Sequence, residues 1–231
     1  MFDAKWQIIV GLSLLALFAV RVVSHFRAKT WEKGKTVFGP IFIIQMALTL
    51  PALIGVLLFV FYEPAVAWAA LPFPEWLRYL GLVLIAFATV FLAWIQYTLG
   101  ANFSPLVRIK SDQQLVIAGP YRWVRHPMYT AIAMLSISLL LMTANWFIGA
   151  AWLLCTGLVM FARTPGEERV LLDAFGDQYR DYMRSTPRFV PNGRPVPERK
   201  RADVSGAAAA GAQAAFSSPL NGSSFNKEKQ L

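Results

Sequence analysis

The sequence is short of the residues that build metal sites and covalent cross-links. Its 231 residues include two histidines, His25 and His126, and a single cysteine, Cys155. A lone cysteine forms no disulfide within its own chain, and by default it is a small core residue. Two distant histidines and one cysteine do not make a ligand set at the spacing that zinc requires. The composition therefore predicts no metal centre and no intrachain disulfide.

Charged residues are also scarce. They make up 15% of the chain, whereas hydrophobic residues make up 56% and aromatic residues 14%. An ordinary soluble domain is considerably less apolar. The sequence also lacks a phosphate-binding loop, a Rossmann glycine fingerprint and a nucleophile elbow. These features together predict an integral membrane protein.

The apolar residues fall into runs of the length that a membrane-spanning helix needs, about 20 residues. The runs are 6–23, 39–62, 77–99, 128–142 and 146–162. The run 128–142 is short for a full span, and only the three residues 143–145 separate it from the next, which predicts a tight helical hairpin. The first run lacks a small-residue cleavage site, so we expect it to remain as a span. The predicted fold class is all-α, an integral membrane helical bundle of about five transmembrane helices.

Beyond Ala162 the pattern changes from a continuous apolar run to alternating apolar and charged residues. Apolar positions at helical spacing predict a C-terminal amphipathic helix at the membrane interface; they are Leu171, Leu172, Phe175, Tyr179 and Tyr182. The end of the chain is rich in Pro, Arg, Ala, Gly and Ser, which predicts a disordered tail. We thus expect N-terminal transmembrane helices in 1–99, a functional core in 100–191 and the tail in 192–231.

The positive charge is arranged as membrane topology requires. The net charge is +9, and most Lys and Arg residues flank alternate apolar runs. Under the positive-inside rule this pattern predicts a multi-pass protein with its N-terminus outside and its C-terminus in the cytoplasm. The loop before residue 127 then also lies on the cytoplasmic face. Because topology accounts for the charge, we expect membrane lipids and no nucleic acid among the partners.

Two polar segments on this face carry the residues capable of chemistry. The first runs from Gly119 to Tyr129 and the second from Arg163 to Glu168. Each has a plainer interpretation: His-Pro as a helix start, the two glutamates as partners of the helix dipole, the arginine as an interfacial anchor, and the aromatic residues as a membrane belt. Their convergence on one rim favours function, because ionisable residues at the membrane edge are functional candidates by default.

Ordered motifs in these segments resemble the isoprenylcysteine carboxyl methyltransferase family and its phospholipid methyltransferase relatives. The resemblance covers about residues 99–191. It rests on Asn102-Phe103-Ser104, Lys110 to Val116, Gly119-Pro120-Tyr121, Arg125 to Tyr129, Arg163 to Glu168, and Phe175 to Tyr179 with Tyr182.

The resemblance implies S-adenosyl-L-methionine as cofactor and a lipophilic acceptor that enters from the bilayer. It implies a cofactor pocket lined by Gln113, Gln114, Leu115, Val116, Tyr121, His126, Pro127, Met128, Tyr129 and Glu167. Arg163 would be the catalytic residue and would bind the acceptor's carboxylate, with Arg125 as a second substrate-binding residue. The family often has an aromatic or His-containing stretch where this chain has Gln113-Gln114, and Arg108 stands near a position that can be a neutral amide there.

Two other functions remain open from the sequence. Membrane sterol reductases share a His-Pro-x-Tyr pattern and use NADPH, although this chain is short for them and its Glu167-Glu168 pair fits the methyltransferase pattern better. A non-catalytic membrane scaffold, whose basic loop binds lipid headgroups, is the third possibility. Cofactor binding separates the three: S-adenosylmethionine, NADPH or neither.

Overall fold

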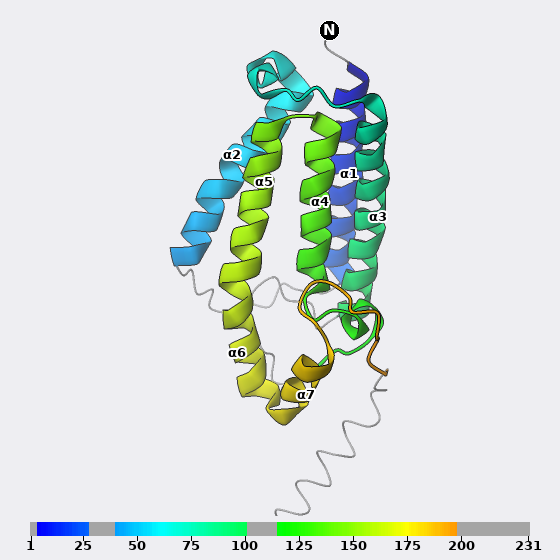
Figure 1. Ribbon diagram of the computed structural model, residues 1–231, viewed down its shortest axis with the longest axis vertical. Helices are drawn as coiled ribbons and strands as arrows, with labels where there is room; N and C mark the ends of the chain where they lie inside the picture. The colour runs from blue at the N-terminus through cyan, green and yellow to red at the C-terminus, as the bar shows by residue number, and fades with distance from the viewer. Residues whose placement is uncertain (1–3, 28–39, 101–114, 198–231) are drawn as a thin grey trace, which may run out of the picture. The chain divides into compact units, whose positions relative to one another are not determined.

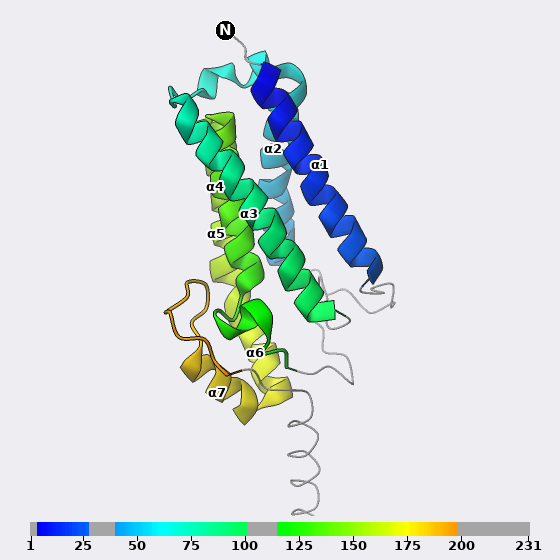
Figure 2. The same ribbon diagram turned by 90° about the vertical axis from the view of Figure 1, so that its right-hand side faces the viewer.

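Long apolar helices run side by side and build the protein (Figures 1 and 2). The computed structural model describes residues 4–27, 40–100 and 115–197, and these ranges are helical with short connections. The longer helices are α1 (Ala4–Arg27), α2 (Pro40–Tyr62), α3 (Glu75–Leu99), α4 (Pro127–Thr143) and α5 (Trp146–Leu158). Residues 1–196 form one compact unit, and only the first residue of the second unit, 197–231, is described. The predicted all-α bundle is confirmed.

Length and composition separate α4 from the other long helices. Among the described residues, four helices are long and apolar enough to cross a membrane, namely Ala4–Ser24, Ile44–Ala65, Glu75–Leu99 and Trp146–Phe175. Helix α4 has 17 residues and is the shorter apolar helix that the sequence predicts at this place. It packs most extensively on α3 and also contacts α5 and α1, so it lies inside the bundle and needs less apolar length.

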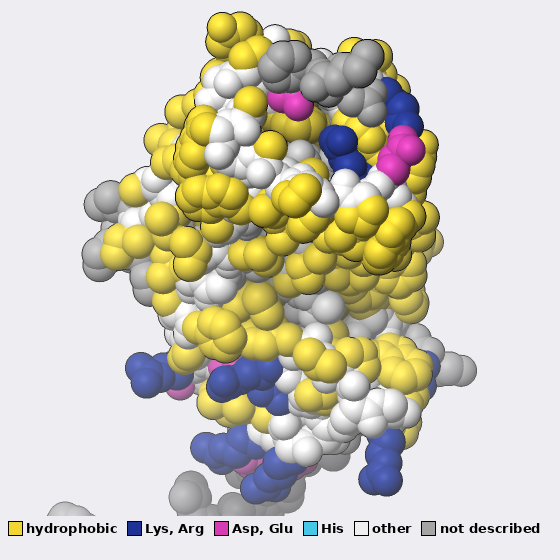
Figure 3. Space-filling view, turned by 45° about the horizontal axis from the view of Figure 1, so that its top comes forward, with side chains coloured by type: hydrophobic (Ala, Val, Ile, Leu, Met, Phe, Trp, Pro, Cys, Tyr) yellow, Lys and Arg dark blue, Asp and Glu magenta, His cyan; other side chains and the backbone are white. Residues whose placement is uncertain are grey.

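The outward faces of the helices are as apolar as the core. On α1, Leu12, Leu15 and Phe18 are more than 60% exposed, at 61%, 64% and 66%. Figure 3 shows an apolar band over the bundle, with Lys and Arg side chains gathered below it at the end that carries α6 and α7. A contiguous apolar surface of this kind is unfavourable in water and is matched by lipid. The surface pattern therefore agrees with an integral membrane protein.

The end of the bundle opposite α6 and α7 is closed by the predicted hairpin turn. Asn145 caps α5: its side chain accepts a hydrogen bond from the Ile148 N–H at 3.0 Å and donates one to the Val66 carbonyl at 2.8 Å. Ala144 takes up a left-handed conformation, with φ of 45°, and its carbonyl accepts from the Leu71 N–H at 2.6 Å. This turn thus joins the α4–α5 hairpin to the α2–α3 connection, which fixes where α4 ends in the bundle.

Two features differ from the single amphipathic helix that the sequence predicts. First, a π-helical turn, Val159–Arg163, joins α5 to α6 (Thr164–Phe175) without a break in the rod. Second, Gly176, with φ of 52°, separates α6 from a further helix, α7 (Asp177–Ser185). Glycine adopts a positive φ without steric cost, so it ends α6 and lets the chain turn. The amphipathic segment is therefore two helices.

Candidate active site

A short turn and a proline position the residues at the start of α4. The turn η4 (Gly119–Arg122) precedes Trp123, and Pro127 occupies the first helical position of α4, where its missing N–H has no helical partner. His126 is the N-cap residue, but its side chain makes no capping hydrogen bond. Its imidazole is therefore directed away from the helix end and reaches the two glutamates of α6.

The π-helical turn Val159–Arg163 sets the register of α6. Such turns add a residue to a helical turn and are frequent at functional sites. Here Arg163, at the end of the π turn, and Glu167, in α6, lie one turn apart on the same face, with Arg163 Nη2 3.2 Å from Glu167 Oε1. The side chains are 25% and 17% exposed, so both retain access from outside. The turn was not predicted from the sequence, because its residues fit an ordinary helix equally well.

Glu167, in the second of the two predicted polar segments, contacts residues of the first. The Tyr129 hydroxyl donates to Glu167 Oε1 at 2.6 Å, and His126 Nδ1 lies 3.8 Å from Glu167 Oε2. Partial burial, and secondly the Glu167 carboxylate, raise the pKa of Tyr121, which places that phenol within reach of the same charge. Tyr121, His126, Tyr129, Arg163 and Glu167 thus share one neighbourhood, although their positions span more than forty residues of sequence.

Glu168 is the centre of a second, buried cluster. Its side chain is 4% exposed, and its Oε1 atom accepts from Arg125 Nη2 at 2.8 Å and lies 3.3 Å from His126 Nε2. Arg188 Nη2 donates to Glu168 Oε2 at 2.7 Å. Arg125, 8% exposed, also donates through Nη1 to the carbonyl of Met183 at 2.8 Å and to that of Thr186. The carboxylate is therefore held by two guanidinium groups and holds the loop before α4 to the chain after α7.

Residues 186–196, which we call the C-terminal strap, lie along the segment 121–130. The N–H groups of Arg125 and His126 donate to the carbonyls of Pro187 and Arg188, both at 2.9 Å. At the far end of the strap, Arg122 Nε donates to the Val196 carbonyl at 2.7 Å, and the Val196 N–H donates back to the Arg122 carbonyl at 3.0 Å. Val196, which the sequence assigns to the tail, thus bonds to the site segment.

Helix α7 also contacts the segment 121–130. The Tyr182 hydroxyl donates to the Tyr121 carbonyl at 2.5 Å, and the Tyr182 side chain is buried. Burial raises the pKa of this phenol well above its ordinary value, so it remains a neutral hydrogen-bond donor throughout the physiological range. Tyr179, also buried, packs edge-on against it at 5.9 Å between ring centroids.

The strap adds an aromatic ring to the cluster around Glu167. Phe189 lies 5.9 Å from the His126 ring, 6.4 Å from Tyr129 and 6.3 Å from Phe161, measured between centroids. His126 and Tyr129 stack at 5.7 Å. Sequence reasoning missed Phe189 and Arg188. A single aromatic residue within a Pro- and Arg-rich stretch was the available signal, and nothing in its spacing says which surface it packs on.

The remaining predicted residues are less central. Pro127 is buried and begins α4, while Leu115 and Val116 are half-buried in the chain that leads to η4. Met128 packs against the apolar cluster of Leu92, Ile95 and Ala131, and so does Tyr121. Gln113 and Gln114 lie outside the described residues, as do Asn102 to Lys110. Within the described part of the chain, no group of three His, Cys, Asp or Glu is arranged to hold a metal.

Comparison with known proteins decides the family. A model of the isoprenylcysteine carboxyl methyltransferase (ICMT) family matches residues 80–173. The chain is 30% identical over 129 residues to a probable protein-S-isoprenylcysteine O-methyltransferase of Oryza sativa subsp. indica, an alignment that covers 53% of this chain and 68% of the relative. The chain belongs to the isoprenylcysteine carboxyl methyltransferase family.

Other members of the ICMT family are longer. Protein-S-isoprenylcysteine O-methyltransferases of Mus musculus and Homo sapiens are 33% and 32% identical over 126 residues, which is 54% of this chain and 44% of each relative. The chain thus spans less than half the length of these two relatives. A solved eukaryotic intramembrane Ras methyltransferase, ICMT, superposes with a TM-score of 0.49 at 28% identity, over 67% of this chain and 53% of the other.

The residues that the family model matches include both Glu167 and Glu168 but not all of their partners. The match begins in α3, passes through Arg125 to Tyr129 and Arg163 to Glu168, and ends at residue 173 in α6. Arg188 and Phe189 lie beyond it. The strap contacts are therefore a feature of this chain's own structure, on which the family model is silent.

Proposed function

We propose that this protein is a membrane-integral methyltransferase that uses S-adenosyl-L-methionine to methylate the carboxylate of a lipophilic, prenylcysteine-like acceptor. The observation that carries the proposal is the meeting of Arg163, Glu167, Tyr129 and His126 where α4 begins and α5 passes into α6. Family membership supports a methyltransferase over a reductase or a scaffold. In this proposal the functional core begins near residue 100 and extends to the strap.

The residues around Glu167 fit the proposed cofactor. The rings of Tyr129, Phe189 and His126 contact one another and form one aromatic cluster, and such a cluster suits a sulfonium cation, which is attracted to a ring face. The Glu167 carboxylate suits an ammonium or hydroxyl donor. Thr164 and Thr186 each have a buried hydroxyl with no hydrogen-bond partner in the described part of the chain, which leaves polar groups there unsatisfied. We assign Tyr121, His126, Tyr129 and Glu167 to cofactor binding and add Phe189.

Arg163 is the better of the two candidate arginines for the acceptor's carboxylate. Its guanidinium meets one described partner, Glu167 Oε1, through one nitrogen and is 25% exposed. A guanidinium of this kind can present a two-pronged face to a second carboxylate. Arg125, by contrast, already donates to Glu168 and to two carbonyls. We therefore assign Arg163 to substrate binding and give Arg125 a positioning role, in place of the substrate contact that the resemblance implies.

The chain's own task in the reaction is positioning. When bound, S-adenosylmethionine would supply an electrophilic methyl group, which would pass to an oxygen of the acceptor's carboxylate as the neutral thioether leaves. A carboxylate is already a competent nucleophile at neutral pH, so the site needs no general base. Arg163 would hold the nucleophile in line, and the buried Glu168 cluster would keep His126 and Phe189 in place. Exclusion of water by the strap would strengthen both interactions.

We further propose that this rim faces the cytoplasm and that the N-terminus lies outside. Arg169 lies in α6, Arg180 and Arg184 lie in α7, and Arg122 in η4 bonds to the strap. Figure 3 shows Lys and Arg side chains gathered at this end of the bundle, in agreement with the positive-inside rule. A lipophilic acceptor would arrive sideways through the bilayer while a water-soluble cofactor arrives from the cytoplasm. This division is a physical reason for a methyltransferase to be built into a membrane.

The decisive experiment uses the purified full chain with S-adenosylmethionine carrying a radiolabelled methyl group. The acceptor is N-acetyl-S-farnesylcysteine, and the matched control is its carboxamide, which differs only at the proposed nucleophile. We expect label transfer to the acid, as a base-labile ester, and none to the amide. Equal labelling of both compounds, or binding of NADPH without binding of S-adenosylmethionine, would refute the proposal.

A further inference from the structure

The C-terminal strap carries an exposed apolar side chain close to its midpoint. Val190 is 75% exposed and follows Phe189, whose ring packs on Phe161 of the π turn at 6.3 Å between centroids. Phe161 is also 75% exposed. Single exposed apolar residues are ordinary on a protein surface, but two beside one contact indicate a surface that has an apolar partner. Lipid is that partner if the strap lies deep enough to meet it.

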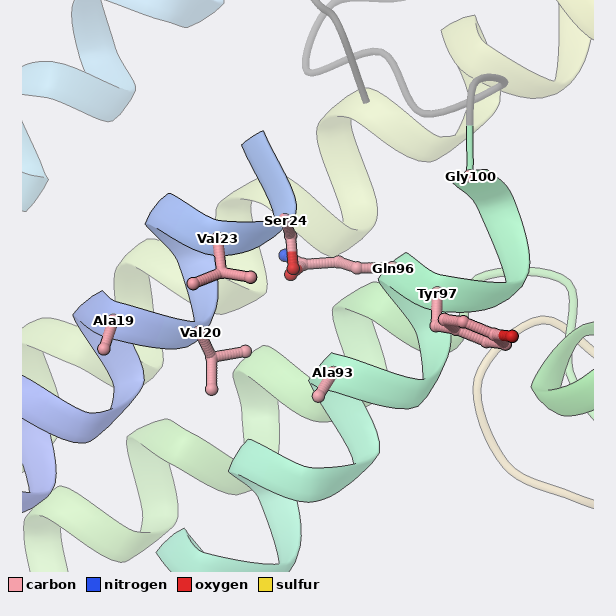
Figure 4. A pocket seen from close by; sticks show the side chains of 8 residues that line it. All are labelled: Ala19, Val20, Val23, Ser24, Ala93, Gln96, Tyr97 and Gly100. Carbon is pink, nitrogen blue, oxygen red and sulfur yellow. The ribbon is translucent and has the colours of Figure 1, made fainter. Parts of the chain in front are cut away.

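Helix α3 shows where the hydrocarbon ends. Tryptophan and tyrosine gather at the two membrane–water interfaces. Trp76, near the start of α3, is 66% exposed, and Tyr97, near its end, is 78% exposed and directed away from α1 (Figure 4). At a rise of about 1.5 Å per residue these positions are about 31 Å apart along the helix, which matches a hydrocarbon core of roughly 30 Å. We therefore place one boundary of the hydrocarbon near Tyr97.

The rod formed by α5, the π turn and α6 gives a consistent depth for Phe161. Trp146, which begins α5, packs edge-on against Trp68 of the turn η2 (Ala67–Ala69) at 5.4 Å between ring centroids. Both side chains are partly exposed, at 47% and 64%, so they mark the opposite interface. From there the hydrocarbon takes about 20 residues of helix, and more where the helix is tilted. Phe161 comes before that length is complete, so its exposed ring lies in the hydrocarbon.

The strap reaches the same depth through its contact with α4. Ala131 of α4 belongs to one buried cluster with Ile95 of α3, which precedes the boundary and lies on its hydrocarbon side. The hydroxyl of Thr130, the residue before Ala131, donates to the Phe189 carbonyl at 2.7 Å. Figure 1 shows the strap, in orange, beside the lower end of α4. The strap therefore passes the boundary at Phe189, and the exposed side chain of Val190 meets lipid.

The chain turns back shortly after Val190 and presents a cation. Gly193, with φ of 79°, allows the turn, and the Arg194 N–H donates to Asn192 Oδ1 at 3.1 Å. Arg194 itself is exposed. A guanidinium so close to an apolar tip is complementary in charge to the phosphates that lie directly outside the hydrocarbon.

We infer that residues 189–194, the tip of the strap, are inserted into the adjoining leaflet of the membrane. The side chains of Val190 and Phe161 lie among phospholipid acyl chains, and Arg194 lies at the phospholipid phosphates. The partner is the bilayer rather than another protein, because both exposed apolar side chains lie on the hydrocarbon side of the boundary and the adjacent cation suits a phosphate.

The test measures the depth of a fluorophore at the strap tip. Val190→Cys, in a Cys155→Ser background, is labelled with a nitrobenzoxadiazole maleimide, and the full chain is placed in nanodiscs of phosphatidylcholine and phosphatidylglycerol, one chain to a disc. Lipids with a nitroxide on the acyl chain near the headgroup are then included as quenchers. We expect quenching at least as strong as for Leu154→Cys, 65% exposed on α5, and several-fold stronger than for Asp181→Cys, exposed on α7.

Val190 is exposed, so the labelled substitution disturbs no packing and the chain should fold as the unlabelled one does. Quenching at position 190 no stronger than at position 181 would overturn the inference, whether water or protein surrounds the tip. No methyl donor or acceptor is present in this measurement, so its result is independent of the proposed function.

The role of Arg194 has its own test in the same labelled chain. Arg194→Gln should raise the ratio of withdrawn to inserted tips about fivefold in these anionic nanodiscs, the effect of one cation near an anionic surface. Fluorescence lifetimes resolve the two populations. Arg180→Gln is the matched control, because Arg180 is exposed on α7 and pairs with Asp177. Equal effects of the two substitutions would overturn the place of Arg194 at the phosphates.

Discussion

Two arginines that look equivalent in the sequence have different environments. Arg125 has an 8% exposed side chain and is surrounded by acceptors, whereas Arg163 is 25% exposed and meets Glu167 through one nitrogen. Arg125 therefore stabilises the fold, since removing it would leave two carbonyls without this donor and Glu168 with one guanidinium partner instead of two. Arg163 is the one whose guanidinium is accessible to a ligand, and the proposed function depends on it.

Replacing Arg163 by glutamine tests this assignment. One charge-assisted interaction contributes about 1.5–3 kcal/mol, so kcat/KM for the farnesylcysteine acceptor should fall about 10- to 100-fold. The dissociation constant for S-adenosylmethionine, measured by calorimetry, should remain nearly unchanged. Arg169→Gln is the control, because Arg169 is exposed on α6, the helix that follows Arg163 directly. Parallel losses in turnover, cofactor affinity and thermal stability would show instead that Arg163 is an interfacial anchor.

For a change at the buried carboxylate of Glu168, we expect a loss of stability rather than a selective loss of turnover. Glu168→Gln keeps the shape of the side chain but leaves Arg125 buried without its counter-charge, which typically destabilises a protein by about 3–5 kcal/mol. We expect a clear fall in the free energy of unfolding, followed by denaturant titration in detergent. Asp181→Asn breaks only the exposed pair with Arg184 and should change stability by less than about 1 kcal/mol. Equal effects of the two changes would contradict the central role of Glu168.

At the scale of elements, the site is built from three segments that belong to different elements of the fold. The π turn delivers Arg163 and Glu167, the start of α4 delivers His126 and Tyr129, and the strap delivers Arg188 and Phe189. The strap has no regular structure of its own. Its position is set by hydrogen bonds to Arg122, Arg125, His126 and Thr130, the last through Thr130 Oγ1 to the Phe189 carbonyl at 2.7 Å.

Truncation separates the strap from the rest of the C-terminus. A chain that ends at Arg201 retains every strap contact, so its cofactor affinity and activity should match those of the full chain. A chain that ends at Ser185 loses the strap and should lose cofactor binding.

Phe189→Leu tests the aromatic ring of the strap in a chain of full length, so its result does not depend on whether the shorter chain folds. This variant keeps an apolar side chain and the backbone bonds, and it should weaken S-adenosylmethionine binding with little change in thermal stability. Unchanged affinity in a well-folded Phe189→Leu protein would remove the aromatic ring from the proposed cofactor site.

At the scale of the whole molecule, the two ends of the bundle have different chemistry. One end is tied by Asn145 and by Arg78, whose Nε donates to the Met142 carbonyl at 2.9 Å, and has few cations. The other carries the basic residues and the candidate active site (Figures 1 and 3). Helix α4 spans between the two at 17 residues because neighbouring helices, rather than lipid, surround most of it.

Cysteine labelling tests the proposed orientation. In a Cys155→Ser background, Ala67→Cys places a thiol at one end of the bundle and Asp181→Cys places one at the other, both at exposed positions. A membrane-impermeant maleimide added to sealed cells should label position 67. Position 181 should react only after the membrane is opened. The reverse order of labelling would place the site outside and exclude a cytoplasmic supply of cofactor.

The sequence by itself determined the helices, because their signals are local. Run length, helical spacing, Pro127 at a first helical position and the short 143–145 turn each act within a few residues, and the structure confirms the bundle that they predict. The resemblance likewise led to the residues around Glu167 and to the family. Gly176 shows the limit of this reasoning, since its break between α6 and α7 depends on a backbone conformation that composition permits but does not require.

Only the tertiary structure decided which charged side chains are already bound by partners within the chain and which are accessible to a ligand. The bond from Arg125 to Thr186 joins residues 61 positions apart, and that from Arg122 to Val196 joins residues 74 apart. No periodicity or local spacing carries information over such distances, because these contacts exist only after the helices have packed and brought the strap to η4.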